Sequence, residues 1–268
     1  MKYAVVVGAG GGMGKATCAL LSEQGYKVWG LDVVFPEEEC PYSRIVADIT
    51  DLRAVERAFE TIKGETSRLD AIIHMAGVYR LNSLVEMPEE TFTGVFQINL
   101  FGVYRVNKVF LPLLGKGSRI LITTSELAPL DPLPFTGIYG ISKTALEKYA
   151  YSLRMELQFL GIGVTVIRPG AVKTGLLSVS TKQLDLFCEK TELYRCNAER
   201  FRKIVNGVET KSVSPERIAA AALRALRAKR TKYVVNVNRN LGLRILNALP
   251  AHWQTAIVKK ILLPEKGK

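Results

Sequence analysis

The sequence has few of the residues that build metal sites and disulfide frameworks. Its 268 residues include four cysteines and two histidines, and the cysteines show no C-x-x-C spacing. A chain of this length does not need covalent cross-links, so we expect reduced thiols and a cytoplasmic location. The dispersed cysteines and the isolated His74 and His252 predict no metal site.

Long uninterrupted apolar runs are also missing from the sequence. No stretch reaches the roughly 18 apolar residues that a spanning helix needs. The apolar run at residues 3–7 is too short for a secretory signal, and the glycines that follow it do not fit the end of such a signal. We therefore expect no membrane-spanning helix, and any membrane contact must be peripheral.

Acidic residues are scarce in the last part of the chain. Residues 195–268 hold 17 Lys and Arg but 4 Asp and Glu, so the net charge of +12 lies there. Nucleic-acid binding calls for stacking aromatics among such cations. This region has Phe201, Tyr233 and Trp253, with Tyr194 at its edge. The composition therefore predicts no nucleic-acid partner.

Short apolar runs alternate with helical patterns along the chain. Val- and Ile-rich runs with little polar alternation are typical of strands buried on both faces. Strands and helices in alternation, joined by right-handed crossovers, predict an α/β fold with a doubly wound parallel sheet. We expect strands at 3–7, 27–31, 44–48, 70–75, 119–124, 164–168 and 232–237, and helices at 13–24, 52–63, 89–114, 138–160 and 215–228.

The first expected strand runs directly into a glycine-rich turn and a helix. Residues 8–14 read G-A-G-G-G-M-G, which fits G-x-x-x-G-x-G through Gly8, Gly12 and Gly14. Glycine lets the backbone approach a pyrophosphate closely, and the helix N-terminus presents free N–H groups to phosphates. A P-loop is excluded, because Ala9 and Ala16 stand where its first glycine and its Ser or Thr belong. The turn predicts dinucleotide binding.

Asp32 ends the second expected strand and bears on the choice of dinucleotide. A carboxylate about 20 residues after the glycines accepts hydrogen bonds from the adenosine ribose. The same carboxylate would repel the 2′-phosphate of NADP. No Lys or Arg follows Asp32 immediately, and Gly11 rather than a basic residue precedes Gly12. We expect NAD in preference to NADP; the alternative is an ordinary solvated aspartate at a strand end.

Tyr139 and Lys143 stand four residues apart in a helical pattern, which places the phenol and the ammonium on one face. An ammonium within about 4–6 Å lowers the pKa of a phenol by roughly 1–3 units. We therefore expect Lys143 to make Tyr139 a general acid and base for a hydroxyl proton. Ser125 ends a strand on the same edge of the sheet, where its hydroxyl can polarise a carbonyl.

These motifs together resemble the short-chain dehydrogenase/reductase family over about residues 2–177. Residues 7–14 are similar to its T-G-x-x-x-G-x-G, with Val7 in place of threonine. Residues 74–77, H-M-A-G, are similar to its N-N-A-G with both asparagines replaced. Further matching segments are D-I-T at 48–50, Asn99, T-S at 124–125, Tyr139 with Lys143, and P-G-A-V-K-T at 169–174.

The resemblance implies a single-domain, Rossmann-like fold and a defined set of site residues. It implies that Tyr139 passes the proton, that Lys143 tunes Tyr139 and holds the nicotinamide ribose, and that Ser125 steadies the substrate oxygen. Asn99 would anchor a water that links Lys143 to solvent. The implied cofactor contacts are Gly8, Gly12, Met13, Gly14, Asp32, Asp48, Ile49, Ala76, Gly77, Tyr139, Lys143, Pro169, Gly170, Val172 and Thr174.

We therefore predict an NAD(H)-dependent oxidoreductase that interconverts a secondary alcohol and a ketone. By analogy with family members, the substrate is expected to be hydrophobic, such as a steroid or a retinoid-like alcohol. The alternative is a non-catalytic dinucleotide-binding sensor or scaffold on the same fold, because fold does not fix function. Such a protein would have no reason to keep Asn99, Ser125, Tyr139 and Lys143 together. A sugar-nucleotide epimerase shares Y-x-x-x-K but usually has another glycine spacing and a larger substrate domain.

We assign residues 1–238 to a dinucleotide-binding catalytic domain and residues 239–268 to a basic amphipathic tail. Within the domain, residues 173–211 are predicted to be an irregular polar loop beyond a strand end, where ligands bind in such sheets, and so a substrate lid. Its apolar side chains would either line an apolar pocket or serve as ordinary packing. They are Leu176, Leu177, Leu184, Leu186 and Phe187.

The chain is expected to form a homodimer or homotetramer. The second of two long helices, at 138–160, carries many apolar residues, and the family resemblance suggests that both helices pair across a two-fold axis. The alternative is that they simply cover the sheet. The residues that prompt this expectation are Leu146, Tyr149, Ala150, Leu153, Leu157 and Leu160.

The tail after residue 239 also has two interpretations. Pro250 can begin a helix in which Trp253, Ile257 and Ile261 recur at four-residue spacing. The tail then either packs over the substrate pocket or a neighbouring subunit, or lies on an anionic membrane surface with its cations near lipid phosphates.

Overall fold

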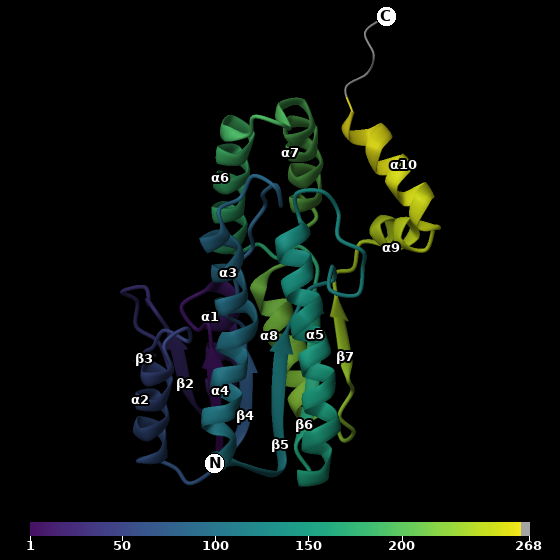
Figure 1. Ribbon diagram of the computed structural model, residues 1–268. Coiled ribbons are helices and arrows are strands. Elements are labelled where there is room, and N and C mark those ends of the chain that lie inside the picture. The colour runs from purple at the N-terminus through teal and green to yellow at the C-terminus, as the bar shows by residue number, and fades with distance from the viewer. Residues whose placement is uncertain (264–268) are drawn as a thin grey trace, which may run out of the picture.

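A seven-stranded parallel sheet forms the centre of the protein (Figure 1). The computed structural model describes residues 1–263, and for residues 175–181 and 208–209 it describes the backbone alone. The strand order is β3-β2-β1-β4-β5-β6-β7, with every neighbouring pair parallel. The strands are β1 Lys2–Val7, β2 Tyr26–Asp32, β3 Ser43–Val46, β4 Leu69–His74, β5 Leu114–Thr123, β6 Gly163–Pro169 and β7 Val234–Val237. The predicted doubly wound sheet is confirmed.

Helices cover both faces of this sheet and pack apolar cores against each of them. Helices α1 (Gly12–Glu23) and α8 (Pro215–Arg227) pack on one face, against alternate β1 residues such as Ala4 and Val6. On the other face, α2 (Leu52–Lys63) and α4 (Val103–Phe110) pack against Val5 and Val7, and α5 (Gly137–Leu157) packs against β5 and β6. Strands buried on both faces explain the continuous apolar runs in the sequence.

The helix expected over residues 89–114 is present but is not uniform. It consists of α3 (Glu89–Phe96), a π-helical segment at Gln97–Gly102, α4, and a short 3₁₀ turn at Leu111–Leu113. A π segment rotates the residues within it relative to a regular helix, and such segments often occur at functional sites. Asn99 lies inside it and is fully buried.

The prediction of an irregular loop at 173–211 was wrong. The chain there forms α6 (Gly175–Lys190) and α7 (Arg195–Glu209), which stand beyond the carboxyl ends of the strands (Figure 1). The helical spacing was present but lay among many polar residues. A shared apolar core holds the two helices together; it includes Leu184, Phe187, Cys188, Ala198, Phe201 and Val205. The side chains of Leu176 and Leu177 lie outside the described part of the chain.

The tail forms two further helices, α9 (Leu241–Asn247) and α10 (Ala251–Leu262), of which α10 lies beside α7 (Figure 1). As expected, Pro250 stands at the start of the second helix, as its N-cap. Val258 and Leu262 pack α10 onto the core between α6 and α7. Within residues 1–263, no helix is both long and apolar enough to cross a membrane.

Candidate active site

The glycine-rich turn places the chain where a diphosphate can approach the start of α1. Gly8 has a φ of +88°, and a side chain there would meet the backbone N of Ala76 at 2.4 Å. A side chain on Gly14 would meet the carbonyl oxygen of Gly8 at 1.9 Å. Both positions therefore require glycine. Gly11 is the N-cap of α1 and has no capping side chain, so the first N–H groups of the helix face the groove outside it.

This groove has a volume of about 750 Å³ and runs along the carboxyl ends of β1, β2 and β4. Asp32 lies in it, with Oδ2 accepting a hydrogen bond from the Gly10 N–H at 2.8 Å and Oδ1 accepting one from the Val33 N–H at 2.7 Å. Asp48 Oδ1 accepts hydrogen bonds from the N–H and hydroxyl of Thr50, each at 2.8 Å. The predicted cofactor residues that line this groove are Gly8, Gly12, Met13, Gly14, Asp32, Asp48, Ile49, Ala76, Gly77 and Thr174.

A second, more apolar cavity lies beside the groove and shares four lining residues with it: Met13, Met75, Gly77 and Thr174. Its floor holds Ser125, Tyr139 and Lys143, together with the predicted cofactor residues Pro169, Gly170 and Val172. Apolar walls come from α7, α9 and the segment before α5; they include Leu127, Leu133, Phe201, Ile204, Val205 and Leu243. The fold thus joins a long groove to an apolar cavity at the Tyr139 side chain.

Burial governs the acidity of Tyr139. Burial, together with the nearby carboxylate of Glu126, raises its pKa to about 12, even though a hydrogen bond with Ser125 lowers it. The expectation that Lys143 lowers the pKa of Tyr139 was therefore wrong for this structure. The Lys143 Nζ lies 5.8 Å from the centre of the Tyr139 ring, and the cost of burying a phenolate dominates the pKa of Tyr139. Tyr139 is protonated at neutral pH and can act as a general acid.

Lys143 is held below Tyr139 by the end of β5. Its ammonium donates a hydrogen bond to the Thr123 carbonyl oxygen at 3.1 Å. Burial lowers the pKa of Lys143 to about 8, because an ammonium is poorly solvated there. A side chain on Gly77 would lie 3.1 Å from this ammonium nitrogen, so glycine keeps the space above Lys143 open. The sequence did not identify the Thr123 carbonyl, since backbone groups leave no sequence signal.

Asn99 lies behind Gly77 and ties three elements together. Its Oδ1 accepts a hydrogen bond from the Val78 N–H at 2.8 Å, and its Nδ2 donates to the Val78 carbonyl and the Ser142 hydroxyl, each at 3.0 Å. A side chain on Gly77 would lie 3.3 Å from the Asn99 Oδ1. The Asn99 Oδ1 and the Lys143 Nζ thus both lie beside Gly77.

His74 and Met75 replace the two asparagines of the family pattern. Both side chains still form hydrogen bonds that connect the end of β4 to neighbouring elements. The His74 Nε2 shares a hydrogen bond of 2.8 Å with the Asn107 Oδ1, and the Asn107 Nδ2 donates to the Tyr149 hydroxyl at 3.2 Å. Met75 Sδ accepts a hydrogen bond from the Thr123 hydroxyl at 3.1 Å. Helices α4 and α5 are thereby connected to β4, so these substitutions change the bracing without removing it.

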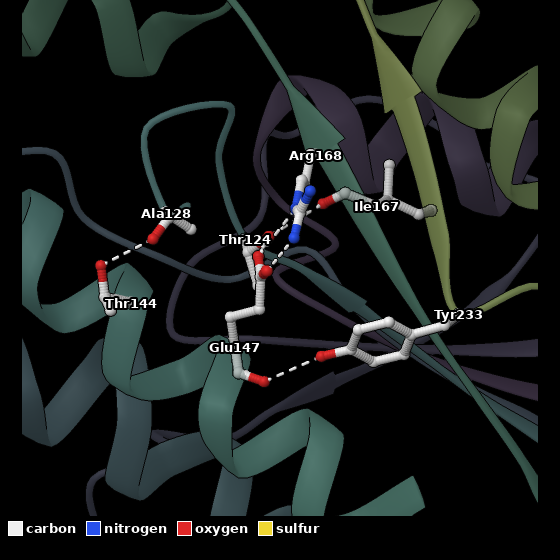
Figure 2. Close-up of polar contacts among 7 residues, drawn as sticks. All are labelled: Thr124, Ala128, Thr144, Glu147, Ile167, Arg168 and Tyr233. Carbon is white, nitrogen blue, oxygen red and sulfur yellow. Dashed lines mark hydrogen bonds and ion pairs between the residues drawn. The ribbon is translucent and has the colours of Figure 1, made fainter. Parts of the chain in front are cut away.

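A buried ion pair fixes α5 against the sheet below the site (Figure 2). Arg168 Nε donates to Glu147 Oε2 at 2.9 Å, and a second contact joins Arg168 Nη2 to Glu147 Oε1. The Thr124 hydroxyl donates to the same carboxylate at 3.3 Å, and the Tyr233 hydroxyl donates to the Glu147 carbonyl at 3.1 Å. Glu147 follows Lys143 by one helical turn, while Thr124 precedes Ser125 and Arg168 precedes Pro169. The network therefore joins the three segments that carry the site.

The sequence analysis missed this network. Each partner is an ordinary polar residue in its own segment, and only the strand order brings α5, β5 and β6 together. Thr144 adds a further tie, with its hydroxyl donating to the Ala128 carbonyl at 2.8 Å (Figure 2). The sequence did contain one signal for this ion pair. Glu147 lies one turn after Lys143, and Arg168 ends the strand expected at 164–168.

Comparison with known proteins identifies the family. The chain matches the short chain dehydrogenase family over residues 2–185, and it belongs to that family. A 3-ketodihydrosphingosine reductase of Bacteroides thetaiotaomicron is 29% identical over 234 residues, which cover 87% of this chain and 86% of the relative. An NADPH-dependent 3-dehydrocapnine reductase of Ornithobacterium rhinotracheale is 30% identical, over 88% of each chain.

Solved structures agree on the fold. A short chain dehydrogenase/reductase of Burkholderia phymatum, in complex with NAD, has a TM-score of 0.74 and 21% identity, over 88% of each chain. The predicted Rossmann-like domain and the predicted family are thus confirmed. The chain is an oxidoreductase that acts on a CH–OH group or a carbonyl with a nicotinamide dinucleotide.

The groove and the turn fit such a dinucleotide. The cradle at Gly8 and Gly14 excludes side chains, and the open N-terminus of α1 supplies the N–H donors that a diphosphate needs. A bound nicotinamide supplies the hydride that is exchanged with substrate carbon. The residues of this chain then have to orient the substrate oxygen and move one proton.

Proposed function

We propose that this chain interconverts a secondary alcohol and a ketone on an apolar substrate, with NAD(H) as its cofactor. The observation that carries the proposal is the apolar cavity that ends at Ser125 and Tyr139 and opens into the dinucleotide groove. Ser125 and Tyr139 hydrogen bond to the substrate oxygen, and Tyr139 holds the proton at its phenol oxygen. The raised pKa of Tyr139 supports proton donation to a ketone, which is the reductive direction.

Lys143 and Asn99 complete the proposed proton path. The lowered pKa of Lys143, about 8, suits a group that returns a proton to Tyr139, and its ammonium would also hold the nicotinamide ribose. Asn99 would anchor a water beside Lys143, a role supported by the position of both side chains beside Gly77. The proposed cofactor contacts are the groove and cavity residues named above. The proposed domain comprises residues 1–238, with 239–268 as its tail.

The substrate class follows from the cavity walls. Most of the cavity surface is apolar, although Glu126 and Thr136 also line it, so a polyhydroxylated substrate would bury several hydroxyls without a partner. The names of the two relatives refer to a 3-keto and a 3-dehydro compound, which makes a long-chain ketone the first compound to test. A steroid ketone and a retinal-type carbonyl represent the classes expected from sequence.

A panel assay tests this function. Purified protein is given NADH and a long-chain ketone, a steroid ketone, a retinoid aldehyde or a ketose, and NADH absorbance is followed. We expect turnover of at least one apolar carbonyl compound and at least about ten-fold lower kcat/KM for the ketose. Equal or better turnover of the ketose would contradict an apolar substrate.

The preference for NAD(H) rests on Asp32. Its carboxylate lies in the groove, and Val33 and Val34, which follow it, are exposed and uncharged. A 2′-phosphate near this carboxylate would meet repulsion instead of a basic partner.

Titration of wild-type protein with NADH and NADPH should give tighter binding of NADH. The Asp32→Ala variant should narrow that difference, because it loses ribose hydrogen bonds and relieves the repulsion. Arg80 also lines the groove. The Arg80→Ala variant is therefore a control that changes the charge of the groove at a position other than Asp32. Tighter binding of NADPH by the wild type would overturn the assignment.

A further inference from the structure

The outer face of α10 carries the apolar stripe that the sequence identified, in which Trp253 and Ile261 are exposed and Ile257 is partly buried. The helix packs on the protein through Val258 and Leu262, so the stripe of Trp253, Ile257 and Ile261 lies on a different side. Trp253 is 56% exposed and Ile261 is 48% exposed. An exposed tryptophan on a helix that already has a packed face indicates a second contact surface.

The charges around this stripe identify its partner. Lys260 follows Trp253 by seven residues, so the two share a face of α10, while Lys259 is exposed on another side of the helix. Residues 239–263 hold four cations, Arg239, Arg244, Lys259 and Lys260, and no Asp or Glu. A tryptophan and isoleucines flanked by cations are typical of helices that lie in the interface of an anionic bilayer.

We infer that the outer face of α10 is a docking surface for anionic lipid bilayers. Trp253, Ile257 and Ile261 enter the headgroup region, and the neighbouring lysines meet lipid phosphates. A second copy of the chain offers this surface no acidic residue from its own residues 239–263, whereas an anionic bilayer offers charges of the opposite sign. The inference stands on α10 alone and does not depend on the identity of the substrate.

Helix α9 connects this surface to the site. Leu243 lines the apolar cavity, while Leu241 and Ile245 on the same short helix are 66% and 58% exposed. Glu126, which follows Ser125 and lines the cavity, accepts a hydrogen bond from the Asn240 N–H just before α9. Docking of the tail would therefore bring the wall of the cavity close to the membrane.

The two tryptophans make the inference directly measurable. Trp29 is fully buried in the core, whereas Trp253 is exposed, so a change in emission on adding vesicles reports Trp253. The full-length protein is titrated with vesicles of phosphatidylcholine containing phosphatidylglycerol, and with phosphatidylcholine alone. We expect a blue shift with the anionic vesicles that weakens in high salt.

Variants separate docking from unspecific adsorption. Lys260→Glu and Ile257→Ser retain Trp253, and each should weaken binding to anionic vesicles by about ten-fold or more. Phe159→Ser is the matched control, since Phe159 is 85% exposed and follows α5 at the opposite end of the sheet; it should bind like the wild type. The inference is overturned if anionic vesicles cause no shift at low salt, if Phe159→Ser weakens binding as much as Lys260→Glu, or if raising the protein concentration alone shifts the emission.

Discussion

Single residues in this protein show how burial sets proton affinity. The pKa of Tyr139 rises to about 12 and that of Lys143 falls to about 8, so burial moves each group toward its neutral form. The same effect lowers the pKa of His74 to about 4. His74 is 1% exposed, and its Nδ1 has no hydrogen-bond partner among the described residues. An imidazolium there would be costly.

His74 should make the fold sensitive to acid. Between pH 6.5 and about 4 the unfolded chain binds a proton at His74 that the folded protein does not, so the free energy of unfolding falls as the pH drops through this window. The contribution is on the order of 3 kcal/mol. The His74→Gln variant, which keeps an amide donor toward Asn107, should show a shallower dependence. Urea unfolding at several pH values measures both slopes, and equal slopes would refute the assignment.

The residues that carry the site were largely predictable because they sit in short motifs. The glycine turn, Asp32, Ser125, Tyr139 and Lys143 each lie at a strand end or a helix start, positions that the sequence pattern locates. The pKa of Tyr139 was not predictable, since it depends on how the cavity walls and Glu126 surround the phenol. A motif predicts which side chains lie close together. Their pKa values also depend on burial, which is set by residues from the whole fold.

Among the elements, α5 matters most because it carries Tyr139 and Lys143 into the cavity. Its position depends on contacts between residues far apart in sequence, with Glu147 joined to Arg168 and to Thr124 (Figure 2). Helices α6 and α7 also depend on contacts that could not be predicted from a single segment. Their apolar residues pair mainly with one another, so the pattern in each segment alone was weak.

Breaking the ion pair below the site should be costly. Glu147 and Arg168 have side chains that are 11% and 19% exposed. Glu147→Ala or Arg168→Ala should each lower the free energy of unfolding by about 3–5 kcal/mol, because each leaves a buried charge without its partner. The Glu147→Ala/Arg168→Ala double variant should lose clearly less than the sum of the single changes.

Denaturant unfolding of the four proteins gives this double-mutant cycle. The exposed pair of Glu60 and Lys63 is the control, with side chains that are 66% and 54% exposed. Glu60→Ala should cost about 1 kcal/mol or less. Additive losses at Glu147 and Arg168 would mean that the two side chains do not act as a pair.

At the scale of the whole molecule, most residues that prompted the oligomer prediction are not free for a contact, although Leu160 is 56% exposed. Leu146, Ala150 and Leu157 are buried against the sheet, and Tyr149 and Leu153 pack on the same core, so they cover the sheet. Other apolar side chains on the neighbouring helices α4 and α5 remain exposed. Tyr104, Tyr151 and Met155 are 44%, 52% and 47% exposed. We propose that this face forms the homo-oligomer contact.

Light scattering tests that contact. Wild-type protein at micromolar concentration should give at least the mass of a dimer, and Met155→Glu should shift it toward the monomer by burying a charge in the interface. Leu193→Glu, at a position that is 66% exposed outside α4 and α5, should leave the mass unchanged. A wild type that is monomeric under these conditions would contradict the proposal.

The central claim is that this fold brings Tyr139 to the substrate as the proton-transfer group. The most direct test compares wild-type and Tyr139→Phe proteins with an apolar ketone that the panel identifies, using NADH absorbance for turnover and titration for cofactor affinity. Removal of the phenol hydroxyl should lower kcat by about 10²–10⁴-fold and leave the Kd for NADH nearly unchanged, because the ring and its packing remain. Near-normal turnover by Tyr139→Phe would contradict the account.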